Sequence, residues 1–269
     1  MLDFSTKLTT SLEPLIGIES LPSEESTPRQ PLEERARRRV DRREIRRQQN
    51  IERIVELAAA EIPDAVAKEA ASSDWLIQFL DFAQDVSDEN AQAFWARLLA
   101  TYIAEPDAIF KRTLAQLRNM DRWELDAFVE YCSFSFTLES GWRFMFEEEL
   151  TRQEIWGYVQ GNDYTQHFIN IGLLSPEIAI MRPAASKGLR IRYFAKEYEL
   201  AAPSKAENND GHVPDAHFGY RKFTPTGQQL AKAVRAKTYY GYARNLIKAL
   251  DNQRKVRFNP IEAADQPTN

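Results

Sequence analysis

The stretch that most constrains the fold is residues 74–106, which predicts two amphipathic helices joined by a very short turn. Apolar side chains recur there at three- and four-residue spacing, and this spacing gathers them on one face of each helix. Ser87 is expected to cap the second helix, and Pro106 limits how far that helix can run. The apolar positions are Trp75, Leu76, Phe79, Leu80 and Ala83 in the first helix and Ala91, Phe94, Trp95, Leu98, Leu99 and Tyr102 in the second. A helical hairpin therefore forms the centre of the N-terminal half.

The turn of this hairpin carries a recognisable pattern. It reads Asp85-Val86-Ser87-Asp88-Glu89 and is followed by Gln92, Trp95 and Ala96. This pattern resembles a bacterial family of uncharacterised proteins that share an Asp-Val-Ser-Asp-Glu, Gln and Trp-Ala signature on a helical hairpin. The resemblance covers roughly residues 51–120. It implies relatedness and a connection with mobile elements or phage defence, and it brings no known activity and no catalytic residues.

Composition narrows the class of protein. With 269 residues the chain is long enough for one large or two modest domains, and its 10 glycines favour helices over a glycine-loop nucleotide enzyme. The single cysteine, Cys132, excludes an intrachain disulfide and a cysteine-based zinc cluster, and its apolar helical face indicates a core position. The chain begins without a secretory signal pattern, and no apolar run approaches the roughly 20 residues that span a bilayer. We expect a bacterial cytoplasmic protein with no membrane partner.

The net charge of −5 conceals one basic segment on an acidic body. Residues 35–47 contain eight arginines against Asp41 and Glu44, a local charge of +6 that leaves −11 for everything else. Closely spaced guanidinium groups neutralise nucleic-acid phosphates well, whereas the alternative is a solvated helix that balances the acidic body. The residues expected to bind nucleic acid here are Arg35, Arg38, Arg39, Arg42, Arg43 and Arg46.

The chain divides by pattern into four parts. Residues 1–30 read as a disordered arm, and residues 31–120 as a helical domain whose first helix runs from about residue 31 to 61. Residues 121–252 form the second domain, which opens on a capping box of Asp121 and Glu124. Residues 253–269 read as a flexible tail.

The order of elements in the second domain resembles the winged helix of many bacterial regulators. Short helices are expected at 150–158 and 164–171, separated by Gly161-Asn162, and Gly172 can end the second of them. Strands follow at 177–181 and 189–193, joined through a hairpin at 182–188. A strand at 218–223 and one long final helix beginning near Thr224 complete the pattern. We therefore predict a mainly α fold, with an N-terminal helical domain followed by a winged-helix-like α+β domain.

A winged helix would present a recognition helix and a basic wing. The helix at 163–171 would expose Thr165, Gln166, His167 and Asn170, and the wing would carry Lys187, Arg190 and Arg192. Asparagine and glutamine can read adenine edges, but this helix contains no lysine or arginine for phosphate contacts. A structural or protein-interaction use of the same domain therefore stays open.

No residues form a recognisable catalytic motif. The carboxylates Asp81, Asp85, Asp88 and Glu89 could hold a divalent cation, although capping and solvation explain them better. The group Asp210, His212, Asp215 and His217 resembles a metal site in composition only. We expect no catalytic residue, metal or cofactor, and a non-enzymatic protein that engages nucleic acid in regulation or defence. The alternative is an adaptor or self-associating helical protein that binds a protein partner or a second copy of itself and no nucleic acid. An enzyme founded on the carboxylate turn is a third possibility.

Overall fold

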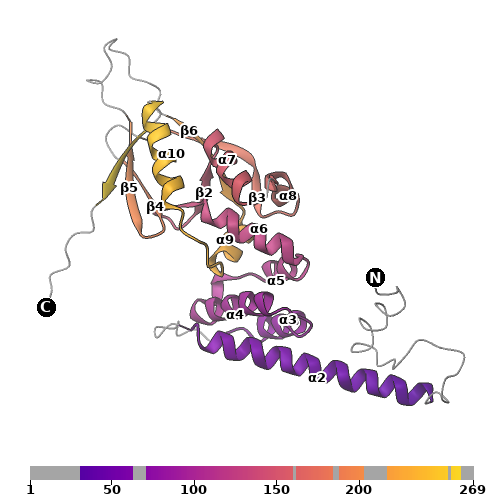
Figure 1. Cartoon of the computed structure of the whole chain (residues 1–269). Coiled ribbons are helices and arrows are strands. Elements are labelled where there is room, and N and C mark those ends of the chain that lie inside the picture. The colour runs from indigo at the N-terminus through magenta and orange to yellow at the C-terminus, as the bar shows by residue number, and fades with distance from the viewer. Residues whose placement is uncertain are drawn as a thin grey trace, which may run out of the picture. The chain divides into compact units, whose positions relative to one another are not determined.

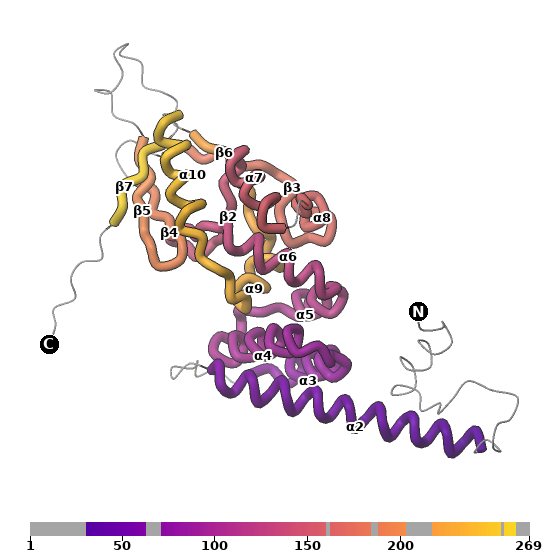
Figure 2. Tube along the Cα trace, viewed as in Figure 1, coloured from indigo at the N-terminus to yellow at the C-terminus, as the bar shows by residue number. Residues whose placement is uncertain are grey.

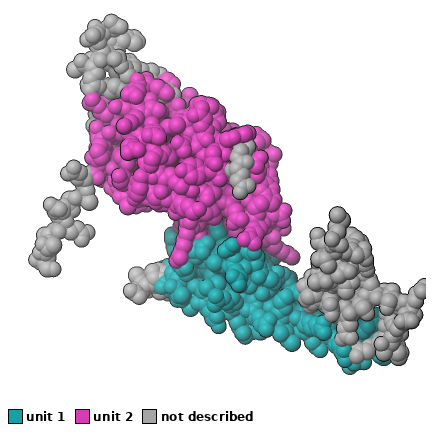
Figure 3. All heavy atoms as spheres, in the orientation of Figure 1, with its two compact units in different colours: residues 1–106 teal, residues 107–269 magenta. Residues whose placement is uncertain are grey.

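A computed structural model describes residues 31–62, 71–159, 162–183, 188–202, 217–253 and 256–261. The chain divides into two compact units, residues 1–106 and 107–269 (Figure 3). The predicted arm at 1–30 lies outside the described residues. The sequence placed a boundary near residue 120, whereas the structure divides the chain after Pro106.

The described residues of the first unit form three helices: α2 (Leu32–Ala59), α3 (Ser73–Ala83) and α4 (Glu89–Ala104). Helix α2 has 28 residues, which at 1.5 Å per residue makes it about 42 Å long. Its buried side chains are Asn50, Ile54 and Ala58, all in the C-terminal half. The N-terminal half of α2 extends past α3 and α4 (Figures 1 and 2), and we call residues 32–49 the α2 overhang.

The predicted hairpin of α3 and α4 is confirmed. Trp75 stacks on Tyr102 with ring centroids 3.6 Å apart, and Phe79 meets Trp95 edge-on at 5.4 Å. The cap is wrong by one residue, because the Asp88 carboxylate accepts a hydrogen bond of 3.0 Å from the Ala91 amide. Ser87 instead accepts a hydrogen bond from α2, and this contact removes it from the capping position.

The second unit combines helices with one sheet. Its helices are α5 (Lys111–Arg118), α6 (Arg122–Ser133), α7 (Glu149–Tyr158), α8 (Thr165–Asn170), α9 (Pro225–Lys232) and α10 (Tyr240–Asn252), and a 3-10 turn, η1 (Pro106–Ala108), lies at the boundary. Its strands are β1 (Phe136–Leu138), β2 (Arg143–Phe146), β3 (Leu174–Met181), β4 (Leu189–Tyr193), β5 (Lys196–Ala201), β6 (Phe218–Phe223) and β7 (Arg257–Ile261). The sheet order is β3-β6-β2-β1-β4-β5-β7, and all neighbours are antiparallel.

This seven-stranded sheet overturns the predicted fold class of a mainly α chain, because the second unit is a sheet-rich domain rather than the expected winged-helix-like α+β domain. Strand β3 pairs with β6 and not with β4, so the hairpin predicted through residues 182–188 is wrong. The predicted single final helix is also wrong, since α9 and α10 are separated by residues 233–239. Alternating side chains identify a strand, but they do not identify which strand it will pair with.

Several predictions that depend on neighbouring residues are confirmed, unlike the predicted strand pairing. The capping box of Asp121 and Glu124 is confirmed at the start of α6. Gly172 adopts a positive φ of 76° after α8, as predicted. Thr224 caps α9 by accepting a hydrogen bond of 3.1 Å from the Gly227 amide. A Cβ atom at Gly227 would lie 2.1 Å from the Leu173 carbonyl oxygen, so only glycine fits there.

The two faces of the sheet differ in chemistry. One face is aromatic, and Tyr242 of α10 packs against Phe136 and Tyr193 on it, with centroids 6.4 and 6.1 Å apart. On the other face, Thr137 of β1 lies opposite Arg143 of β2 and Arg192 of β4. The aromatic face is therefore part of the core, while polar side chains cross the central strands on the opposite face.

Candidate nucleic-acid interface

The arginines of the α2 overhang include four that lie on one line. Positions i, i+4, i+7 and i+11 share one face of an α-helix. Arg35, Arg39, Arg42 and Arg46 occupy these positions, and we call them the arginine stripe. At 1.5 Å per residue the stripe is about 16 Å long.

Three members of the stripe, Arg39, Arg42 and Arg46, are accessible to solvent. Arg39 and Arg42 are exposed, and Arg46 is half-buried. Within the described part of the chain, none of these three forms an ion pair with a carboxylate. The neighbouring Arg38, by contrast, forms an ion pair with Glu34, with a guanidinium nitrogen 3.0 Å from a carboxylate oxygen. Arg39, Arg42 and Arg46 therefore present guanidinium groups that have most of their donors available.

The α2 overhang is anchored at its C-terminal end by the turn between α3 and α4. Arg47 donates two hydrogen bonds, of 2.8 and 2.9 Å, to the Asp85 carboxylate, and these raise the pKa of Arg47. Just beyond it, the buried Asn50 amide donates to the Gln84 carbonyl at 2.8 Å and accepts from Gln92 at 3.1 Å. Asp85, Ser87 and Gln92 thus fasten α2 to the hairpin turn.

Most of the residues considered as metal ligands either bind groups of the protein or lie outside the described residues. Asp85 binds Arg47, and Asp88 caps α4. Three members of the second group, Asp210, His212 and Asp215, lie outside the described residues. Across the residues that the structure describes, no group of three or more histidine, cysteine or acidic side chains could hold a metal ion.

The helix predicted to read DNA has its side chains engaged within the second unit. Gln166 binds Asn170 at 2.9 Å on the same helix. The His167 ring contacts the Glu124 carboxylate at 2.5 Å, and Thr165 lies 3.2 Å from the Tyr131 hydroxyl. These contacts tie α8 to α6 and leave two of the four predicted reading residues, Gln166 and Asn170, exposed.

The predicted wing residues are placed differently from the expectation. Arg190 and Arg192 lie on β4, which pairs with β1 and β5 in the centre of one sheet. They are not on the wing of a recognition helix, and they lie in a different unit from the arginine stripe. Lys187 lies outside the described residues.

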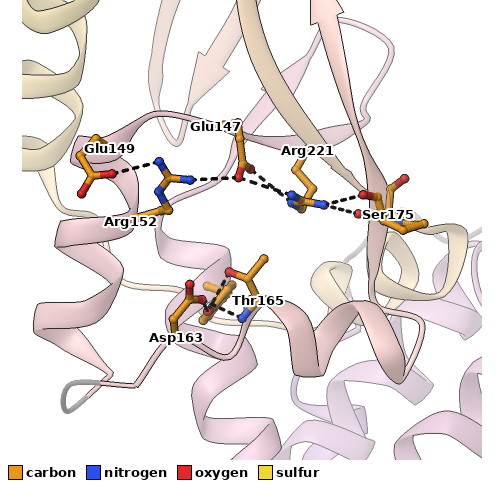
Figure 4. Close-up of polar contacts among 9 residues, drawn as sticks. Glu147, Glu149, Arg152, Asp163, Thr165, Ser175 and Arg221 are labelled. Carbon is orange, nitrogen blue, oxygen red and sulfur yellow. Dashed lines mark hydrogen bonds and ion pairs between the residues drawn. The ribbon is translucent and has the colours of Figure 1, made fainter.

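A buried arginine that the sequence did not single out holds the sheet together (Figure 4). Arg221 of β6 is 6% exposed and binds the Glu147 carboxylate at 3.2 Å. It also donates hydrogen bonds of 2.7 and 3.1 Å to the carbonyls of Ser175 and Pro176. The register of β3 shifts there, between Leu174 and Ile178. Arg221 therefore satisfies backbone groups at an irregular strand, which is a structural role.

The neighbouring Asp163 shows how local donors set a pKa. Burial alone would raise the pKa of this carboxyl group. Hydrogen bonds from the Thr165 hydroxyl and amide and from the Tyr131 hydroxyl, together with the charge of Arg152, outweigh burial and lower the pKa (Figure 4). Asp163 is thus held as a carboxylate that orders the start of α8.

Cys132 is confirmed as a core residue. The thiol is fully buried, and burial raises its pKa to about 12, although the charge of Arg143 opposes the shift. A nucleophilic cysteine needs a lowered pKa, so this thiol is unsuited to covalent catalysis.

A protein-family model matches most of the chain. Residues 34–247 match the model of a family described as "Protein of unknown function (DUF2806)". The chain belongs to this family. The match runs from the α2 overhang into α10, so it spans parts of both units and the positions of the arginine stripe. No curated protein and no solved structure matches the chain. Among the described residues of this DUF2806 protein, no helix is long and apolar enough to cross a membrane.

Proposed function

We propose that this DUF2806 protein binds nucleic acid through the arginine stripe, by contacts to phosphate groups. The observation that carries the proposal is that Arg39, Arg42 and Arg46 share one helix face without carboxylate partners in the described structure. Guanidinium groups bind phosphate oxygens in a bidentate way. The overhang has no aromatic residue on which bases could stack. Binding is therefore largely independent of base sequence.

The charge distribution confines this contact to the overhang. The chain outside residues 35–47 carries a net charge of −11, which repels a polyanion. The buried residues of α2 begin at Asn50, so residues before it can lie along a nucleic acid without disturbing the core. Such binding weakens steeply with salt, since phosphate neutralisation releases counterions.

The test compares binding to labelled duplex DNA and duplex RNA at about 50 and 200 mM salt, the range over which phosphate contacts show their salt dependence. The variant Arg39→Ala/Arg42→Ala/Arg46→Ala removes the three unpaired members of the stripe. If each contacts one phosphate, the slope of log K against log salt falls by about 2–3 on DNA. Circular dichroism checks that α2 remains helical.

A matched control removes the same charge from the same helix. The variant Arg38→Ala/Arg43→Ala/Arg53→Ala replaces arginines that already pair with Glu34, Glu44 and Glu56. We expect it to reduce affinity less than the stripe variant does. Equal losses in both variants would assign binding to net charge, and an unchanged slope in the stripe variant would contradict the proposal.

We further propose that the protein acts by binding rather than catalysis, in regulation or in defence against phage or mobile elements. The alternative of a hairpin that docks a protein or a second copy rested on the apolar stripe of α4. The apolar residues Phe94, Trp95 and Leu98 of α4 are buried, which gives that alternative less support. Light scattering distinguishes the two, because a monomer that binds DNA with the expected salt slope excludes self-association as the basis of function.

A further inference from the structure

A cavity on the polar face of the sheet brings together two arginines from the second unit. It has a volume of about 190 Å³ and is lined by Ser135, Thr137, Arg143, Arg192 and Phe194. Thr137 lies directly opposite both arginines in the strand register. Neighbouring strands are about 4.8 Å apart, so the two arginine backbones are about 10 Å apart, with the threonine between them.

Both guanidinium groups have donors to spare. Arg143 donates one hydrogen bond of 3.3 Å to the Ser135 hydroxyl, and in the described structure neither Arg143 nor Arg192 forms an ion pair. Ser135 is buried and donates its own hydrogen to the Cys132 carbonyl at 2.7 Å, so it orients Arg143. The Thr137 hydroxyl makes no hydrogen bond to a described residue.

The backbone of Arg143 is held from the other side by α9. The Gln228 side chain accepts a hydrogen bond of 2.9 Å from the Arg143 amide and donates one of 2.7 Å to the Arg143 carbonyl. This double contact fixes the first residue of β2 beside β1. The cavity therefore has one arginine whose backbone and side chain are both positioned before any ligand binds.

The wall of the cavity includes a strained residue. Phe194 has a φ of 51° and is the first residue of the two-residue turn between β4 and β5. Glycine is the usual residue at a positive φ in such turns, and a bulky side chain there is an outlier. The turn alone does not require a phenyl ring. Strain of this kind points to a use for the side chain at a binding site.

We propose that this cavity binds the phosphate group of a small phosphate monoester. Arg143 and Arg192 contact it from two sides, the Thr137 hydroxyl donates from the floor, and the Phe194 ring excludes water. A phosphate monoester carries a charge close to −2 at neutral pH, which matches two guanidinium groups better than a single carboxylate does.

An adjoining cavity suggests the chemistry of the rest of the ligand. It has a volume of about 160 Å³, shares Thr137 and Arg192 with the first, and is also lined by Glu139, Arg190 and Glu197. The carboxylates of Glu139 and Glu197 accept hydrogen bonds from hydroxyl groups. A phosphorylated sugar or polyol therefore fits the pair of cavities.

The test is calorimetric titration of the full chain with inorganic phosphate, ribose 5-phosphate and unphosphorylated ribose. We expect saturable binding of the two phosphates, tighter for the ester, and no binding of ribose. Arg192→Gln should weaken both by about tenfold or more. Arg190→Gln is the matched control, because Arg190 lies on the same strand and face but lines only the adjoining cavity. Inorganic phosphate should bind the Arg190→Gln variant with the same affinity as the unmodified protein.

A second variant separates binding from folding. Phe194→Gly suits the positive φ of the turn, so thermal stability should be preserved while phosphate affinity falls several-fold. Three outcomes would overturn the proposal: no saturable phosphate binding at millimolar concentration, equal losses of affinity for inorganic phosphate from Arg190→Gln and Arg192→Gln, or unchanged affinity in Phe194→Gly. The Arg39→Ala/Arg42→Ala/Arg46→Ala variant should bind these ligands normally, so this site and the nucleic-acid interface fail independently.

Discussion

The arginines of α2 and the arginine of β6 are the same residue type put to opposite uses. The α2 overhang holds eight arginines within thirteen residues, 35–47, and apart from Arg47, which binds Asp85, these side chains lie before the anchored part of the helix. Arg221 stands in an aromatic strand, is 6% exposed, and has a carboxylate and two carbonyls as partners. We therefore expect the arginines of the stripe to contribute little to folding, whereas Arg221 stabilises the sheet.

The physical reason lies in the cost of desolvation. A buried charge is stable only when its hydrogen bonds are satisfied, and removing one partner leaves the other uncompensated. An exposed charge stays hydrated in the folded protein, so its ion pairs contribute little to the free energy of unfolding. Charge density in a sequence therefore points to a binding surface, while burial decides which arginine the fold depends on.

The largest effect is expected for Arg221→Met. The substitution leaves Glu147 with only its longer contact of 3.8 Å to Arg152, and it leaves two carbonyls of the irregular part of β3 without the Arg221 donors. We expect a loss of about 3–5 kcal/mol in the free energy of unfolding. Urea denaturation measures it, with Arg122→Ala on the exposed surface of α6 as the control. A loss below about 1 kcal/mol would remove the contrast between the two sets of arginines.

The next effect concerns the two halves of α2. Asn50→Ala removes the amide that joins α2 to Gln84, Ser87 and Gln92. Buried groups left without a partner cost about 1–3 kcal/mol, and that is the expected destabilisation. Gln49→Ala, on the neighbouring exposed position, should change stability by less than about 0.5 kcal/mol. Similar losses in both variants would show that the overhang is packed as tightly as the anchored half.

A smaller effect should appear as a pH dependence in the second unit. The pKa of Asp163 is lowered in the folded protein, so its contribution to stability is present above the unfolded pKa of about 3.9 and is lost as the pH falls below it. Asp163→Asn should be less stable than the unmodified protein at neutral pH, and the two should converge under acid conditions. Urea midpoints across this range measure the effect. Asp251→Asn on α10 is the control, and parallel curves for Asp163→Asn and the unmodified protein would contradict the assignment.

The sequence predicted what depends on neighbouring residues and missed what depends on distant ones. The helix at 31–61, the hairpin and the capping box of Asp121 are local patterns, and the structure has them. Alternation located β4 at 189–193, but its partners β1 and β5 come from segments too short or too polar to stand out. The winged-helix prediction failed at that step, since it paired β3 with its nearest neighbour in the chain.

The candidate sites follow the same division. The arginine stripe lies within one helix, so spacing alone reveals it. The phosphate cavity joins Arg143 and Arg192 across three strands, and no spacing in the sequence places them together. Arg192 was singled out for its charge, whereas Arg143 and Phe194 carried no sequence signal.

The smallest effect on stability is expected in the stripe itself. Arg42 is exposed, has no ion pair among the described residues and lies well before the first buried residue of α2. Alanine has a slightly higher helix propensity than arginine, so Arg42→Ala should change the free energy of unfolding by less than about 0.5 kcal/mol. Affinity for duplex DNA at low salt should nevertheless fall, because one phosphate contact and its released counterion are lost. Arg42→Lys keeps the charge but not the bidentate fork, so it should recover the salt slope and only part of the affinity. A variant that lost stability and kept its DNA affinity would reverse the roles assigned to the two sets of arginines.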